Sequence, residues 1–60
     1  MSFKSARLKA GKKVAEVAIH MGVSDVTVWM WETGKSAPRI PRLKELADYY
    51  GVTVDELLSE

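Results

Sequence analysis

Apolar residues recur at helical spacing along most of the chain. Val14, Val17, Ala18 and Met21 stand at i, i+3, i+4 and i+7, which places them on one face of a helix. The same full pattern is formed by Leu43, Leu46, Ala47 and Tyr50. A shorter version, at i, i+3 and i+7, is formed by Phe3, Ala6 and Ala10. These patterns predict amphipathic helices over residues 2–10, 14–21 and 41–50.

The helix that follows residue 22 is predicted mainly from the residues at its two ends, and less from an apolar face. Gly22 can adopt the left-handed conformation that closes the preceding helix, and Ser24 can cap a new one. The valines, threonine and tryptophans that follow also suit a β-strand. The cap at the start and the glycine at position 34 decide in favour of a helix from Ser24 to Thr33.

The C-terminal segment carries a capping box. Thr53 and Glu56 have the T-x-x-E spacing in which each side chain bonds the other residue's backbone amide. We expect a short helix here, with Val54, Leu57 and Leu58 facing inward. Five short helices joined by tight turns give an all-α bundle, and 60 residues predict a single domain over residues 1–60.

The net charge of +1 hides an uneven distribution. Residues 1–44 contain all nine basic residues and three acids, a balance of +6, whereas residues 45–60 contain five acids and no base, a balance of −5. A cationic body with an anionic C-terminal segment indicates a polyanionic partner for one face. Taken by itself, the asymmetry is equally well explained as ordinary surface charge.

Several classes of protein are disfavoured by composition. The chain has no cysteine and one histidine, His20, which we interpret as a solvated helix residue, so we expect no metal and no cofactor. No carboxylate pair, nucleophile with a base, or phosphate-binding glycine loop indicates an enzyme. No apolar run suits a signal peptide or a membrane span, which favours a cytoplasmic protein without a membrane partner.

Residues 14–33 have the features of a helix-turn-helix. Ala18 is small enough for two helices to cross closely, and Gly22 tolerates the turn between them. Together with Arg7, the WETGK sequence at 31–35 and the GVTVDELL sequence at 51–58, this pattern resembles the Cro and lambda-type phage repressor family of Xre-like proteins. The resemblance implies a compact five-helix lambda-repressor-like DNA-binding domain.

What the resemblance implies about function is a sequence-specific transcriptional regulator, most simply a small phage or prophage repressor. Such a protein binds double-stranded operator DNA as a homodimer and places its third helix in the major groove. The family's base-facing or groove-lining positions fall here on Asp25, Val26, Thr27, Trp29 and Met30. Advancing by about 100° per residue from an inward Val28 also turns Val26, Met30 and Thr33 outward, with Trp29 on the flank.

These positions carry few of the polar side chains that usually read bases. The carboxylate of Asp25 can accept a hydrogen bond from a cytosine amino group, or it can simply stabilise the positive end of the helix dipole. Thr27 is the other polar candidate. Val26, Trp29 and Met30 can pack on thymine methyl groups or can form a contact surface for another protein.

Phosphate contacts are implied at two places. Lys12, Lys13 and the amide of Val14 lie where the family clamps the DNA backbone, although Val14 replaces the family's usual glutamine. Lys35 and Arg39 lie just after the third helix, where they would hold the backbone on its other side. A solvated basic surface is the alternative interpretation of all these residues.

Arg7 and Glu32 both fall on inward faces, and in resembling proteins these positions form an ion pair that links the first and third helices. The alternative function is a protein-interaction module, similar to an antitoxin, that uses Trp29 and Met30 as hydrophobic anchors.

Overall fold

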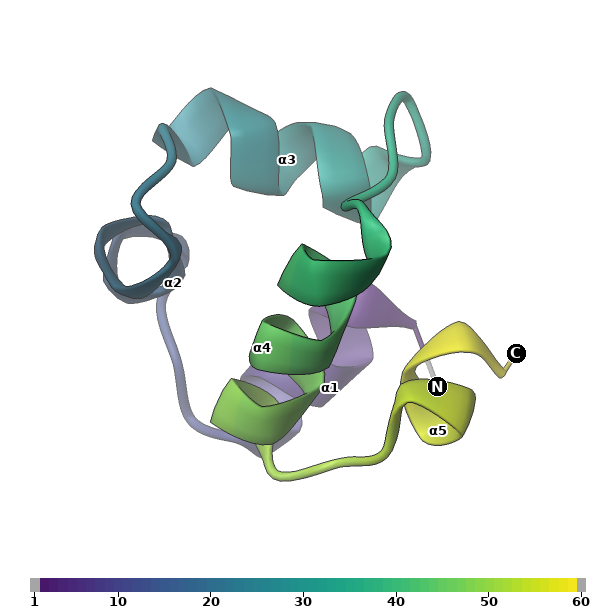
Figure 1. Ribbon diagram of the computed structural model, residues 1–60. Helices are drawn as coiled ribbons and strands as arrows, with labels where there is room; N and C mark the ends of the chain where they lie inside the picture. The colour runs from purple at the N-terminus through teal and green to yellow at the C-terminus, as the bar shows by residue number, and fades with distance from the viewer. Residues whose placement is uncertain (1, 60) are drawn as a thin grey trace.

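Five helices pack around one core in the computed structural model, which describes residues 2–59 (Figure 1). They are α1 (Phe3–Lys9), α2 (Val14–Met21), α3 (Asp25–Thr33), α4 (Ile40–Tyr50) and α5 (Val54–Leu58). Within the described residues there is no strand, and the predicted all-α fold with a helix-turn-helix is confirmed. The two ends of the predicted domain, residues 1 and 60, lie outside the described residues.

The predicted caps of α3 and α5 are formed. The hydroxyl of Ser24 accepts from the amide of Thr27 at 3.2 Å, which satisfies one unpaired donor of α3. Thr53 accepts from the amide of Glu56 at 3.0 Å, and the Glu56 carboxylate accepts from the amide of Thr53 at 3.2 Å. Gly22 ends α2 with φ at 69°, a backbone conformation that side chains disfavour.

Two details differ from the sequence prediction. The fourth helix begins at Ile40 instead of Pro41, because a proline is tolerated in the first turn, where amides have no helical partner. Leu58 is 57% exposed and does not face inward. A helix of five residues makes little more than one turn, so it turns one leucine fully into the core, and that residue is Leu57.

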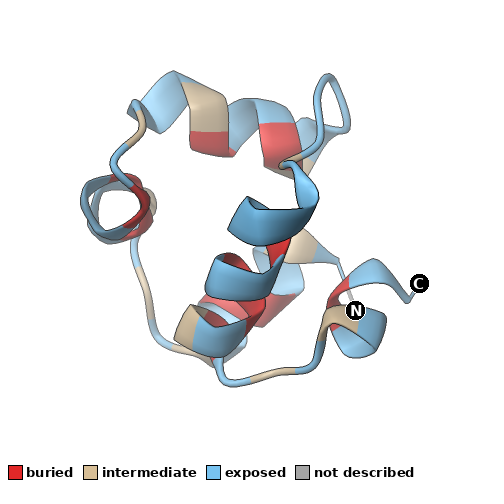
Figure 2. Ribbon diagram, viewed as in Figure 1, coloured by how far each residue is buried: buried red, intermediate tan, exposed pale blue. Residues whose placement is uncertain are grey.

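The core lies between the inner sides of all five helices (Figure 2). α2 packs mainly on α3, and α1 contacts α3, α4 and α5. The buried apolar residues all stand at predicted inward positions and comprise Ala6, Val17, Ala18, Met21, Val28, Trp31, Leu43, Leu46, Ala47, Tyr50 and Leu57. Four other residues predicted to face inward are only partly buried against this core: Phe3, Ala10, Val14 and Val54. Every helix contributes residues to the buried set, so detaching any one helix would expose apolar core surface to water.

An ion pair joins α1 to α3 inside this arrangement. The Nε of Arg7 donates to Glu32 Oε2 at 2.7 Å and its Nη2 donates to Glu32 Oε1 at 3.2 Å. The two side chains are 8% and 3% exposed. The Nη1 of Arg7 donates to the carbonyl of Lys12 at 3.1 Å, which ties the α1–α2 loop to the same guanidinium. The hydrogen bonds to Glu32 raise the pKa of Arg7 above its ordinary value.

Removing the carboxylate should therefore destabilise the fold strongly. We expect Glu32→Ala to lower the free energy of unfolding by about 3 to 5 kcal/mol, because it leaves a buried guanidinium without its counter-charge. For a chain this short, that corresponds to a fall in Tm of more than about 10 °C in thermal unfolding followed by circular dichroism. The double variant Arg7→Met, Glu32→Leu should recover most of the loss; an unchanged midpoint in Glu32→Ala would contradict the role of the pair.

Tyr50 is a second polar group within the core. It is 6% exposed, and burial, followed by the nearby charge of Glu32, raises its pKa to about 12. The folded protein therefore holds the phenolic proton more tightly than the unfolded chain, in which tyrosine titrates near pH 10. Stability from this group is complete below that pH and is lost as the pH rises towards the folded-state pKa.

We expect the free energy of unfolding to fall between about pH 10 and pH 12 by on the order of 2 kcal/mol through Tyr50. Tyr50→Phe keeps the ring and removes the titrating hydroxyl, so its stability should decline less over this range. Urea unfolding at successive pH values measures the difference. Tyr49→Phe is the matched control and should keep the steeper decline of the original protein; equal slopes in both variants would refute the assignment.

Candidate nucleic-acid interface

The two sides of α3 differ sharply in exposure (Figure 2). On the inner side, Val28 and Trp31 are 1% and 6% exposed. On the outer side and flank, Val26 is 61%, Trp29 49% and Met30 41% exposed. The helix therefore has the orientation that the sequence predicts, with an apolar outer surface that nothing within residues 2–59 covers.

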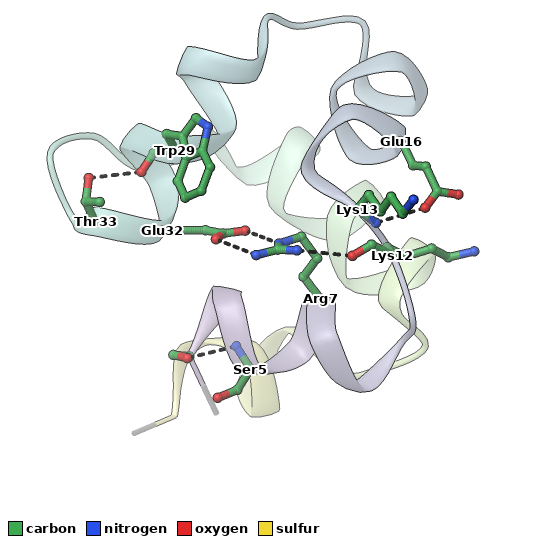
Figure 3. A network of polar contacts seen from close by, with 9 residues as sticks. Ser5, Arg7, Lys12, Lys13, Glu16, Trp29, Glu32 and Thr33 are labelled. Carbon is green, nitrogen blue, oxygen red and sulfur yellow. Dashed lines mark hydrogen bonds and ion pairs between the residues drawn. The ribbon is translucent and has the colours of Figure 1, made fainter.

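Most polar groups on this surface are already bonded locally. The hydroxyl of Thr27 lies 3.0 Å from that of Ser24, within the cap of α3. The hydroxyl of Thr33 donates to the carbonyl of Trp29 at 2.9 Å (Figure 3). Asp25 is exposed in the first turn of α3, beside the positive end of the helix, and has no hydrogen-bond partner among the described residues. Its carboxylate is therefore the side chain on this surface best placed to accept a hydrogen bond from a ligand.

The turn between α2 and α3 sets the position of this surface. The amide of Val23 donates to the carbonyl of Ala18 at 3.0 Å across Gly22, which closes α2. Ala18 is 3% exposed, which is consistent with the close crossing expected of a small residue. Val23 packs against the core at the entry to α3, as a hydrophobic staple with Val28 would.

Arg42 is a positioning residue that the sequence analysis missed. From α4, its Nη1 donates to the carbonyl of Met21, an otherwise unpaired group in the last turn of α2. The same nitrogen lies 3.9 Å from the carboxylate of Glu45, one turn further along α4. Because this contact spans 21 residues and Arg42 has no local motif, no sequence pattern indicated that it fixes the end of α2.

The predicted phosphate-contacting residues lie at both ends of the helix-turn-helix. Lys13 is exposed just before α2, where the Glu16 carboxylate accepts from its amide at 2.9 Å (Figure 3). The ammonium group of Lys13 carries no hydrogen-bond acceptor atom, so it cannot accept from the first-turn amides of α2. Within residues 2–59, the Glu16 carboxylate therefore makes the only side-chain cap of this helix. Val14 is the first residue of α2, so its backbone amide lies in the first turn of that helix. Lys35 and Arg39 are exposed after α3, and the amide of Lys35 is anchored to the carbonyl of Met30 at 3.0 Å.

Lys12 has an aromatic partner that was not foreseen. Its ammonium lies 4.8 Å from the centroid of the Tyr49 ring, a cation–π contact between the α1–α2 loop and α4. His20 is exposed, as predicted, but stacks on the same ring with centroids 3.9 Å apart and planes 10° from parallel. Because Tyr49 is 29 and 37 residues from these partners, spacing along the chain gave no sign of the cluster. Residues 2–59 contain no group of acids or histidines suited to hold a metal ion.

The Ser24 cap determines where α3 begins and can be tested directly. We expect Ser24→Ala to lower the free energy of unfolding by about 1 kcal/mol, because the amide of Thr27 loses its acceptor. Chemical denaturation measures the change. Ser36→Ala is the matched control, since Ser36 is exposed in the following loop and only its backbone is bonded. Equal stability of the two variants would show that the cap does not hold α3.

A family model described as "Helix-turn-helix domain" matches residues 2–59. The HTH-type transcriptional activator BcrR of Enterococcus faecalis is 36% identical to the chain over 58 residues, which covers 93% of this chain and 28% of that protein. The chain thus spans under a third of that relative, and no solved structure matches it. Within residues 2–59, no helix has the length and apolar character needed to cross a bilayer.

Proposed function

We propose, from the premise that the chain belongs to the helix-turn-helix domain family, that it is a DNA-binding regulator of transcription whose α3 lies in the major groove. The observation that carries this proposal is the exposed outer face of α3, together with exposed cations before and after the helix-turn-helix in the chain. Lys13 precedes α2, while Lys35 and Arg39 follow α3. Exposed cations before and after the helix-turn-helix in the chain suit a groove bounded by two phosphate backbones.

The size of the molecule supports binding as a homodimer to a pseudo-palindromic operator. Residues 2–59 measure 24 × 23 × 19 Å, less than the roughly 34 Å that separates two successive turns of the major groove on one side of the duplex. One copy therefore reads a single half-site, and two copies give the buried area that tight specific binding needs. The resemblance to phage repressors favours repression, while the similar protein of Enterococcus faecalis is described as an activator.

The electrostatic part of the proposal predicts a steep dependence on salt. Affinity for random-sequence 24-base-pair duplexes, measured by fluorescence anisotropy from low to physiological salt, should fall linearly on logarithmic axes. Lys35→Ala and Arg39→Ala should each weaken binding and reduce the slope by about 0.9, the value for one lost phosphate contact. Lys44→Ala, which removes an exposed cation of α4 outside the predicted clamp, should leave the slope unchanged.

Two results would overturn the proposal. One is binding without salt dependence, and the other is equal slopes for the Lys35, Arg39 and Lys44 variants. A protein-interaction module would behave differently: its affinity for a protein partner would survive loss of these cations but would depend on Trp29.

A further inference from the structure

Three exposed apolar side chains form a continuous strip on α3. Val26, Trp29 and Met30 stand at i, i+3 and i+4, so Val26 is a surface neighbour of both Trp29 and Met30. We call these three residues the apolar strip. From Val26 to Met30 the helix rises by about 6 Å, which is close to two base-pair steps of about 3.4 Å each. The apolar strip is therefore long enough to cover two or three consecutive base pairs.

Hydrogen-bonding groups on and beside the apolar strip are few. The hydroxyls of Thr27 and Thr33 bond to the Ser24 cap and to the Trp29 carbonyl, as described above. The indole N–H of Trp29 is a single donor and cannot form the two parallel bonds by which arginine, asparagine or glutamine reads a purine. In the major groove, the one apolar group that distinguishes base pairs is the 5-methyl group of thymine.

The charges around the apolar strip favour DNA as its occupant over an apolar protein surface. Lys35 and Arg39 follow the strip along the chain, and Lys13 precedes the helix-turn-helix. Glu32, the acid of α3 besides Asp25, is turned inward and bonded to Arg7. Exposed cations that precede and follow an apolar helix face along the chain suit a partner that presents both methyl groups and phosphates, as one groove of DNA does.

We infer, relying on the proposed DNA-binding function, that α3 selects operator half-sites by their thymine methyl groups, which pack on the apolar strip. Asp25 adds one polar preference at the start of the helix. Its carboxylate accepts from the amino groups of cytosine and adenine and is repelled by the two acceptors of guanine. The preferred half-site thus has consecutive thymines beside a base that presents an amino group.

Replacing thymine by deoxyuridine tests this inference without a known operator. Random-sequence duplexes are first enriched for binding to the protein, and the enriched pool is then copied with either dTTP or dUTP. The copies share their sequences, backbone charge and hydrogen-bonding groups and differ in the 5-methyl group alone. We expect the uracil copy to bind roughly fourfold more weakly for each contacted methyl, or about sixteenfold for two and about sixtyfold for three.

Variants of the apolar strip connect the effect to its residues. Trp29→Ala, Val26→Thr and Met30→Gln should each bring the ratio of thymine to uracil affinities closer to one. Val26→Thr keeps the shape of the side chain at a 61% exposed position, so it tests the inference even where a larger change alters folding. Lys35→Ala is the control: it should weaken binding to both copies equally and leave the ratio unchanged.

The outcomes separate this inference from the function on which it rests. Equal affinity for the two copies, with salt-dependent binding intact, overturns methyl recognition and leaves DNA binding standing. A ratio that none of the three strip variants changes overturns the assignment to the apolar strip. A pool that cannot be enriched, or a protein that binds DNA without salt dependence, overturns the proposed function and the inference together.

Discussion

The Arg7–Glu32 ion pair is the interaction on which the position of α3 depends. One guanidinium bonds the carboxylate of α3 at 2.7 and 3.2 Å and the Lys12 carbonyl in the α1–α2 loop at 3.1 Å. Three segments thus converge on a single buried charge (Figure 3). Because a buried charge is costly unless every partner is in place, this cluster favours one arrangement of α1, α3 and the loop between α1 and α2. The outer face of α3 follows from that arrangement.

The small size of the core limits the stability of the fold. A chain of 60 residues has a total stability on the order of 3 to 9 kcal/mol, and it cannot spare apolar residues for two surfaces. Yet α3 leaves Trp29 and Met30 substantially exposed while it buries Val28 and Trp31. Large apolar side chains left in water suit a helix that meets a partner, and the exposed Lys35 and Arg39 that follow α3 favour a polyanionic one.

The sequence was sufficient to predict the helices because their signals are local. Ser24 and Thr53 bond amides three residues away, and Gly22 needs only its own backbone freedom. The i, i+3, i+4, i+7 pattern also identified the inward faces. The prediction was wrong for Leu58 because the spacing of residues does not show how far a five-residue helix can turn towards the core.

By itself, then, the sequence determined which segments are helical, where they end and which side of α3 is buried, since each depends on residues within a turn or two. The tertiary structure alone decided which distant groups meet: Arg42 with the last turn of α2, and Tyr49 with both Lys12 and His20. The contacting residues lie 21 to 37 positions apart in the chain, and no short sequence motif marks them. Such contacts depend on how packed helices orient their side chains, which helical periodicity within one segment does not specify.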